Sequence, residues 1–280
     1  MKNLILFNLF ILLIIIVGYG NAEDSNKTYF NRTMGLNLIQ NGSYEEGVTL
    51  LHEYASINNS DVEVWNAIGF AYNNLGQFNQ SLDLLSRATS LDPDHGFAWT
   101  NTGWALNELD RYDEAKIALN NAVLVDPDNK YAWSTLGYTL IRTGNYKEAI
   151  IALDKALLID PKFSDAWNNL GWAYGEQKNY HLAISALENA TIFDPKNGYA
   201  WNNLGRLYYL LGDKNKAMEA LYTATDTRPD FDQGWYNLGN VLYAVGNSSG
   251  SIEAYRKAIK LNPENNIAKE NLEILENNLI

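Results

Sequence analysis

The sequence predicts an all-α protein, an α-solenoid of stacked helical hairpins, and three regularities lead to this prediction. A tryptophan recurs six times at a spacing of 34 residues, a glycine follows each of them four residues later, and a proline follows 28 residues later. A fixed period of this length indicates tandem units that pack mainly on their neighbours. The tryptophans of the series are Trp65, Trp99, Trp133, Trp167, Trp201 and Trp235.

Each 34-residue unit is predicted to hold two helices. In residues 130–163, apolar residues recur at the i, i+3, i+4, i+7 spacing of one helical face, and a second such set follows. The two sets are Trp133, Leu136, Gly137 and Leu140, then Ala149, Leu153 and Ala156. Gly144 separates the sets, and Pro161 ends the second helix because proline cannot continue one. One unit is therefore a helical hairpin.

The first residues of the chain have the pattern of an export signal. Lys2 precedes an apolar run from Leu4 to Val17, and Gly20-Asn21-Ala22 follows with small residues where a signal peptidase would cut. Residues 1–22 are therefore predicted to be a signal peptide, with residues 23–27 as a linker. The alternative is an N-terminal membrane anchor through residues 4–20, since a spanning helix needs about 20 apolar residues. Either reading places the repeats outside the cytoplasm, secreted or at the cell surface.

The array itself is predicted to run from residue 28 to the C-terminus. Residues 28–61 form a degenerate capping repeat that keeps Gly35 and Tyr44 but lacks the tryptophan and the proline. Six full units follow, which we call repeats 1 to 6: 62–95, 96–129, 130–163, 164–197, 198–231 and 232–265. Residues 266–280 form a capping helix, because Leu272, Leu275 and Leu279 fall on one helical face.

A glycine in the middle of each first helix needs an explanation, because glycine there costs roughly 1 kcal/mol relative to alanine. It stands at position 8, counting from the start of each repeat: Gly69, Gly103, Gly137, Gly171, Gly205 and Gly239. Position 20, on the second helix, is always serine or alanine, for example Ser81 and Ala115. We expect the two helices to approach closely at these small residues.

The repeated pattern resembles the tetratricopeptide repeat family, whose 34-residue signature has a tryptophan, Leu-Gly, a tyrosine, an alanine and a proline. The resemblance covers Val62 to Asn265. It has small departures: Leu106 stands where the signature has tyrosine, and position 17 is polar at Lys214. It implies a right-handed superhelix whose first helices line a concave groove. It also implies a surface that binds other proteins.

Position 6 of the repeats is a candidate peptide-binding column. It carries four asparagines: Asn101, Asn169, Asn203 and Asn237. A carboxamide both donates and accepts, so it can pair with the backbone of any bound peptide. The column resembles the asparagine ladder in the repeats of O-linked N-acetylglucosamine transferases, which holds extended polypeptide. The alternative is that Trp-x-Asn-Leu-Gly is simply a common sequence pattern of this family, with no role in binding.

Position 9 is expected to add aromatic rings to the same groove. The rings are Phe70, Trp104, Tyr138 and Trp172. The Trp, Leu and Gly columns already fill the hairpin seam, so these rings are expected to be partly exposed, where they can contact a peptide, an apolar ligand or a sugar. Arg206 and Arg142 are the cations expected on this side, and they can hold a carboxylate.

Composition excludes several other functions. The chain has no cysteine, so disulfides and thiolate sites are absent, and its net charge of −12 with no basic stripe argues against nucleic acid as a partner. The three histidines occupy unrelated repeat positions, and no catalytic grouping, metal site or cofactor motif can be assembled. Asn-x-Ser/Thr sequons allow glycans, and they begin at Asn26, Asn31, Asn41, Asn58, Asn79, Asn189 and Asn247.

These observations together predict a non-enzymatic, extracytoplasmic scaffold for protein–protein interaction. It would bind a peptide segment or a partner protein in the concave groove, through the asparagine column and the ring column. The alternative function is that of an envelope assembly or glycan-binding accessory subunit, whose rings would stack on sugars.

Overall fold

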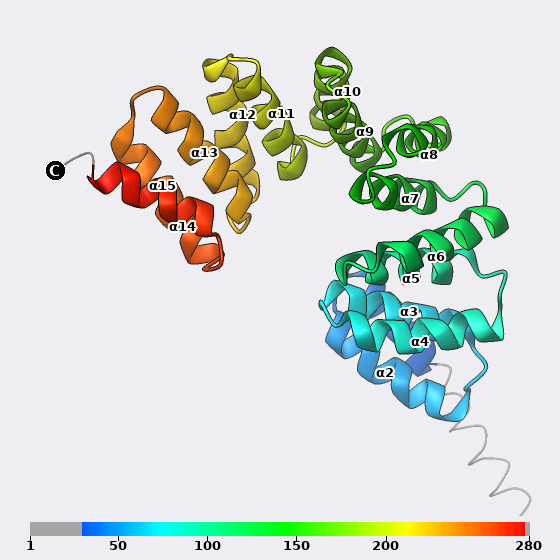
Figure 1. Ribbon diagram of the computed structural model, residues 1–280. Coiled ribbons are helices and arrows are strands. Elements are labelled where there is room, and N and C mark those ends of the chain that lie inside the picture. Colours follow the sequence, from blue (N-terminus) through cyan, green and yellow to red (C-terminus); the bar gives the residue numbers. More distant parts are fainter. Residues whose placement is uncertain (1–29, 278–280) are drawn as a thin grey trace, which may run out of the picture. The chain divides into compact units, whose positions relative to one another are not determined.

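The computed structural model describes residues 30–277, and every regular element in that range is a helix (Figure 1). The chain divides into two compact blocks, Met1–Pro127 and Asp128–Ile280, which we call the N-terminal and C-terminal blocks. The predicted leader and linker, the first two residues of the capping repeat, and residues 278–280 lie outside the described residues. None of the helices within residues 30–277 combines the length and the hydropathy needed to cross a bilayer.

In the N-terminal block, the described helices follow one another in antiparallel pairs. The capping repeat holds a helix described over residues 30–40, followed by α2 (Tyr44–Ile57). Repeat 1 holds α3 (Val62–Asn74) and α4 (Phe78–Leu91), and repeat 2 holds α5 (Gly96–Glu108) and α6 (Tyr112–Val125).

The C-terminal block holds the remaining four hairpins. Its helices are α7 (Lys130–Arg142), α8 (Tyr146–Ile159), α9 (Ser164–Glu176), α10 (Tyr180–Phe193), α11 (Gly198–Leu210), α12 (Lys214–Thr227), α13 (Asp232–Ala244), α14 (Ser248–Leu261) and α15 (Asn266–Asn277). In repeats 1 to 6 the first helix always has 13 residues and the second always has 14. The prediction of an all-α array of helical hairpins is therefore confirmed.

The position-8 glycine faces the second helix of its own hairpin. A Cβ added to Gly103 would lie 2.4 Å from Cγ of Leu119, and one added to Gly137 would lie 2.5 Å from Cγ of Leu153. Close approach is as expected, but the nearest atoms belong to the leucine at position 24 rather than to the small residue at position 20. A buried leucine can fill this space only because the first helix has no side chain there.

In repeats 1, 2, 4, 5 and 6, the tryptophan joins its repeat to the loop before it. Its indole Nε1 donates a hydrogen bond to the backbone carbonyl six residues earlier, for example from Trp99 to Pro93 at 2.7 Å and from Trp167 to Pro161 at 2.8 Å. Trp65 donates in the same way to Asn59, and Trp201 and Trp235 donate to Pro195 and Pro229. The shared period of tryptophan and proline thus reflects a bond between them as well as packing.

A left-handed residue at position 15 closes the turn between the two helices of each repeat. Four repeats use glycine there, with positive φ at Gly76, Gly144, Gly212 and Gly246. The other two use Asp110 (φ 56°) and Lys178 (φ 61°), where an L side chain adopts a conformation that glycine accepts at less cost. Lys178 is therefore a strained position in an otherwise regular array.

Candidate partner-binding surface

The position-6 asparagines bind the neighbouring repeat. In the N-terminal block, Nδ2 of Asn101 donates to Oδ1 of Asn66 at 2.9 Å. In the C-terminal block, Nδ2 of Asn203 donates to Oδ1 of Asn168 at 2.9 Å, and Asn237 donates to Asn202 at 2.8 Å. Each acceptor stands at position 5 of the preceding repeat, so these amides link adjacent first helices.

This linkage changes what the asparagine column offers to a ligand. Position 5 is buried at Asn66, Thr100, Ser134 and Asn202. Oδ1 of Asn237 accepts from Gln233 at 3.3 Å. By contrast, Oδ1 of Asn101 and Oδ1 of Asn203 accept no hydrogen bond from the described residues, and both side chains are half-buried. The column therefore presents acceptors more than donors.

Asn169 differs from the other members of the column. The preceding repeat has Ser134 at position 5, so Asn169 has no asparagine acceptor there. Its Oδ1 instead accepts a long bond from Nδ2 of its neighbour Asn168, at 3.5 Å. Its side chain is half-buried, like those of Asn101 and Asn203.

The four position-9 rings are half-buried, and neighbours contact each other within each block. Phe70 and Trp104 lie 6.0 Å apart between centroids with tilted planes in the N-terminal block. Tyr138 and Trp172 lie 5.9 Å apart in an edge-to-face arrangement in the C-terminal block. Such geometries are the favoured ones for aromatic pairs. Each block thus carries an aromatic pair that spans two consecutive first helices.

The two predicted cations sit beside these rings in the C-terminal block. Nη1 of Arg142 donates to the hydroxyl of Tyr138 at 2.7 Å, and its guanidinium lies 5.7 Å from the ring centroid. Nη2 of Arg206 lies 3.9 Å from Oε1 of Glu176, which also accepts from Nε1 of Trp172 at 3.2 Å. The Arg206 side chain is 51% exposed, so its ion pair is loose and open to solvent.

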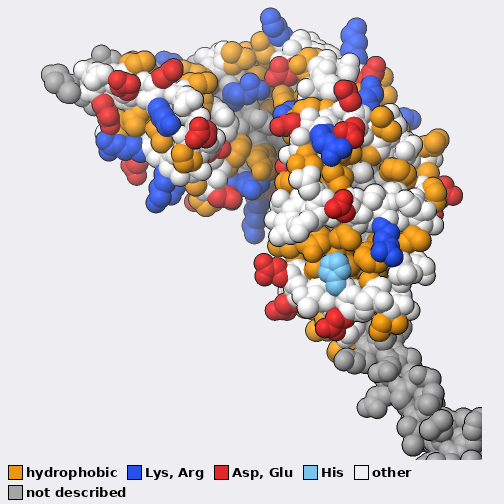
Figure 2. Space-filling model, turned by 60° about the horizontal axis from the view of Figure 1, so that its bottom comes forward, with side chains coloured by type: hydrophobic (Ala, Val, Ile, Leu, Met, Phe, Trp, Pro, Cys, Tyr) orange, Lys and Arg blue, Asp and Glu red, His pale blue; other side chains and the backbone are white. Residues whose placement is uncertain are grey.

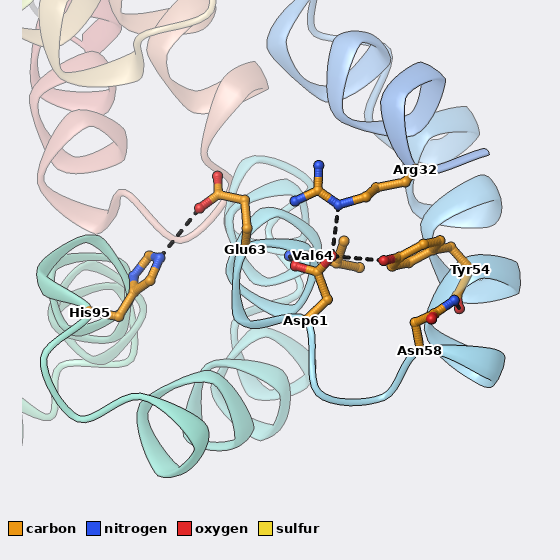
Figure 3. Close-up of polar contacts among 7 residues, drawn as sticks. All are labelled: Arg32, Tyr54, Asn58, Asp61, Glu63, Val64 and His95. Carbon is orange, nitrogen blue, oxygen red and sulfur yellow. Dashed lines mark hydrogen bonds and ion pairs between the residues drawn. The ribbon is translucent and has the colours of Figure 1, made fainter. Parts of the chain in front are cut away.

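A polar cluster that sequence reasoning missed joins the capping repeat to repeat 1 (Figure 3). Oδ2 of Asp61 accepts from Nε of Arg32 at 2.7 Å and from the Tyr54 hydroxyl at 3.0 Å, while Oδ1 accepts from the backbone N–H of Val64 at 3.3 Å. Burial opposes ionisation of Asp61, but these bonds outweigh it and lower the pKa of the carboxyl. The side chains of Arg32, Tyr54 and Asp61 therefore all have partners within the cluster, and its role is to hold the capping repeat against repeat 1.

Positions 2 and 34 of the same repeat form matched pairs. Nε2 of His95 lies 3.3 Å from Oε2 of Glu63, and this bond raises the pKa of His95 (Figure 3). The other pairs are Tyr131 with Phe163 at 5.3 Å between centroids, Asp165 with Asn197 at 3.3 Å, and Tyr199 with Phe231 at 4.9 Å. The matching of acid with donor and ring with ring is visible in the sequence once the two positions are aligned.

Other candidate sites are less developed. A shallow pocket of about 320 Å³ beside Trp235 is lined by Glu253, Arg256, Lys257 and Lys260, and it contains none of the predicted binding residues. Within residues 30–277, no three histidine, aspartate or glutamate side chains are grouped as metal ligands. Of the sequon asparagines, Asn31 is buried and donates to Glu53, whereas Asn41, Asn79 and Asn247 are exposed.

Comparison with family models gives matches over most of the array. Four models described as tetratricopeptide repeat match residues 62–95, 106–171, 168–232 and 233–265. No curated protein sequence matches the chain.

Solved structures of similar fold include three that share 16–20% sequence identity with this chain. A chain of the APC/C hetero-tetramer Cut9-Hcn1 matches with a TM-score of 0.76 and 18% identity, over 85% of this chain and 47% of its own length. A repeat protein from Parabacteroides merdae matches with a TM-score of 0.70 and 16% identity, over 90% of this chain and 99% of its own length. A thermophilic protein from Thermus thermophilus matches with a TM-score of 0.57 and 20% identity, over 64% of this chain and 98% of its own length. These likenesses establish the hairpin array.

Proposed function

Because the chain belongs to the tetratricopeptide repeat family, we propose that it is a non-enzymatic scaffold that binds an extended segment of a partner protein along its first helices. The arrangement that supports this most directly lies in the C-terminal block. Tyr138, Trp172 and Arg206 occupy the same position on three successive first helices, and Asn203, whose carboxamide oxygen is open, precedes Arg206 by three residues on α11.

Each of these groups suits a different part of a peptide. The half-buried rings of Tyr138 and Trp172 offer apolar surface to a hydrophobic side chain. Oδ1 of Asn203 can accept a backbone N–H of the ligand, whatever its sequence. The Arg206 guanidinium, held only loosely by Glu176, can form a charge-assisted bond with a carboxylate. A segment with apolar residues and an acidic group therefore fits this surface.

The test is site-specific photocrosslinking in intact cells. A photoreactive residue at Arg206 is expected to capture a partner protein, whereas the same residue at Glu219, on the exposed outer side of α12, is not. Trp172→Ala should weaken capture at Arg206 by about tenfold if the ring supplies roughly 1.4 kcal/mol of binding. Equal capture at both sites, or capture unaffected by Trp172→Ala, would contradict the proposal.

Location outside the cytoplasm is part of the proposal and rests on the leader, residues 1–22. Glycans are compatible with the exposed sequon residues Asn41 and Asn247. N-terminal sequencing of the native protein distinguishes a cleaved leader from a membrane anchor through residues 4–20. A chain that begins at Met1 and stays soluble in the cytoplasm would contradict export.

The alternative, a glycan-binding accessory subunit, needs open ring faces on which a sugar can stack. The position-9 rings are tilted or edge-on to one another and half-buried, so only part of each ring is accessible. This arrangement favours peptide side chains over sugar rings. Binding to purified glycan preparations that is lost in Trp172→Ala would favour the alternative instead.

A further inference from the structure

The second helix of repeat 3 exposes two large aliphatic side chains on its outer face. On α8, Ile151 is 62% exposed and Leu158 is 77% exposed, and they stand seven positions apart, so they lie on the same side of the helix. Figure 2 shows hydrophobic side chains lying between charged ones on the face in view. Exposed aliphatic residues grouped in this way mark interaction surfaces.

The hairpin itself does not require aliphatic residues at these two positions. The equivalent positions, 22 and 29, are polar in repeats 1, 5 and 6, where they carry Asp83, Ser90, Glu219, Asp226, Glu253 and Lys260. Repeat 2 carries Ile117 and Leu124 there, also exposed. Since the polar repeats form the same 14-residue helix, Ile151 and Leu158 serve something other than the packing of the hairpin.

Two opposite charges lie between the aliphatic residues. Asp154 and Lys155 are both exposed, and neither side chain has an ion pair or hydrogen bond with another described residue. The midpoint between residues 154 and 155 is also the midpoint between residues 151 and 158. A two-fold axis through that point would therefore place Asp154 opposite Lys155 and Ile151 opposite Leu158.

We propose that the outer face of α8 binds the same face of a second copy of this chain, with the two helices antiparallel. Ile151 of each copy packs on Leu158 of the other, and Asp154 of each copy pairs with Lys155 of the other. In an isologous contact of this kind, the same patch of both copies forms the interface, and the dimer has two-fold symmetry. Two-fold dimers are the commonest symmetric oligomers. The surface is distinct from the peptide-binding first helices.

Charge complementarity selects a second copy over other occupants. A lipid surface would leave Asp154 and Lys155 without partners, whereas a copy of α8 pairs both. The net charge of −12 opposes dimerisation only weakly, because charges beyond about 8 Å are screened at physiological ionic strength. The same construction fails on α14, whose central residues Arg256 and Lys257 are both cations, and on α6 it brings together only two uncharged asparagines, Asn120 and Asn121.

Disulfide crosslinking of the full chain tests this proposal, because the chain has no cysteine of its own. In the double variant I151C/L158C, the two thiols of one copy lie about 10 Å apart along the helix, too far to bridge. A disulfide between cysteines of this chain must therefore join two copies. We expect covalent dimers on a non-reducing gel after mild oxidation of cells that produce the variant. The same cysteines on α12, in E219C/D226C, provide the matched control and should give about tenfold less dimer.

Charge reversal then separates specific pairing from collision. Adding Asp154→Lys, or Lys155→Asp, to the I151C/L158C variant places like charges opposite each other and should reduce the dimer about tenfold. Combining both reversals restores opposite charges and should restore the dimer. Absence of dimer in the first variant, equal dimer in the α12 control, crosslinks only to other proteins, or failure of the combined reversal to rescue would each overturn the proposal.

Discussion

The side-chain amide of Asn203 donates a hydrogen bond to Oδ1 of Asn168, 2.9 Å away and 35 residues earlier in the sequence. The same bond joins Asn237 to Asn202 and Asn101 to Asn66. The position-6 asparagines therefore hold neighbouring repeats together, in addition to any part they take in binding. This dual use determines which of them can be replaced without cost to stability.

Asn203→Ala is expected to lower the free energy of unfolding by about 1 kcal/mol, because the partly buried amide of Asn168 loses its partner. Asn168→Ala should cost a similar amount, and the double variant should cost less than the sum of the two. Urea denaturation followed by circular dichroism measures all three. Asn169→Ala is the control, since Asn169 lacks an asparagine acceptor in the preceding repeat, and a loss there as large as in Asn203→Ala would contradict this account.

Lys178→Gly is expected to stabilise the protein by about 1 kcal/mol, because Lys178 has a φ of 61° that glycine adopts without strain. The equivalent turns already use glycine, as at Gly144. Lys178→Ala should give no such gain, since alanine has the same Cβ. The thermal unfolding midpoint reports the difference, and equal midpoints for the Gly and Ala variants would rule out backbone strain as the cause.

Gly103→Ala should destabilise the protein by about 1–3 kcal/mol, because the new methyl group would lie 2.4 Å from Cγ of the buried Leu119. Gly175 provides the matched control. It also lies in a first helix, but a Cβ there meets nothing within 4 Å, so Gly175→Ala should be neutral or stabilising by up to about 1 kcal/mol. Chemical denaturation of the two variants compares packing with helix propensity, and the two effects should have opposite signs.

Stability should depend on pH through the pair His95–Glu63. The hydrogen bond to Glu63 raises the pKa of His95 in the folded state, so the proton binds the folded chain more tightly. The pair's contribution is fully present below the ordinary histidine pKa of about 6.5 and is lost as the pH rises through the raised value. The unfolding midpoints of wild type and Glu63→Gln should therefore differ most near about pH 6, and the difference should shrink as the pH rises above the ordinary histidine pKa. A constant difference across that range would exclude the linkage.

The sequence predicts the hairpins well because the same pattern of residues recurs in six tandem repeats. Trp99, Gly103 and Pro93 each recur in register, so period and helix number can be read without coordinates. The contacts between repeats are harder to predict. The partner of Asn203 is Asn168, and nothing in the helical periodicity says that positions 6 and 5 of adjacent repeats meet. That pairing depends on how one hairpin rests on the next, which a single-helix pattern does not encode.

In the candidate site, too, the sequence predicts which residues lie on the first helices but not the contacts between repeats. The sequence could place Tyr138 and Trp172 on the first helices, because the hairpin seam was already filled by other columns. It could not foresee that the two rings touch at 5.9 Å, or that Glu176 connects Trp172 to Arg206. Those details arise from side chains that meet across repeats.

The matched pairs at positions 2 and 34 bear on how such an array can change length in evolution. Glu63 and His95, like Tyr131 and Phe163, both belong to a single 34-residue segment. Duplicating or excising a whole segment therefore carries both partners together and never brings an acid against a ring. The tryptophan bond also survives such an event, because the carbonyl it needs precedes every full repeat. Gene duplication within the coding sequence can thus extend or shorten the protein without first inventing new compensating mutations at these contacts.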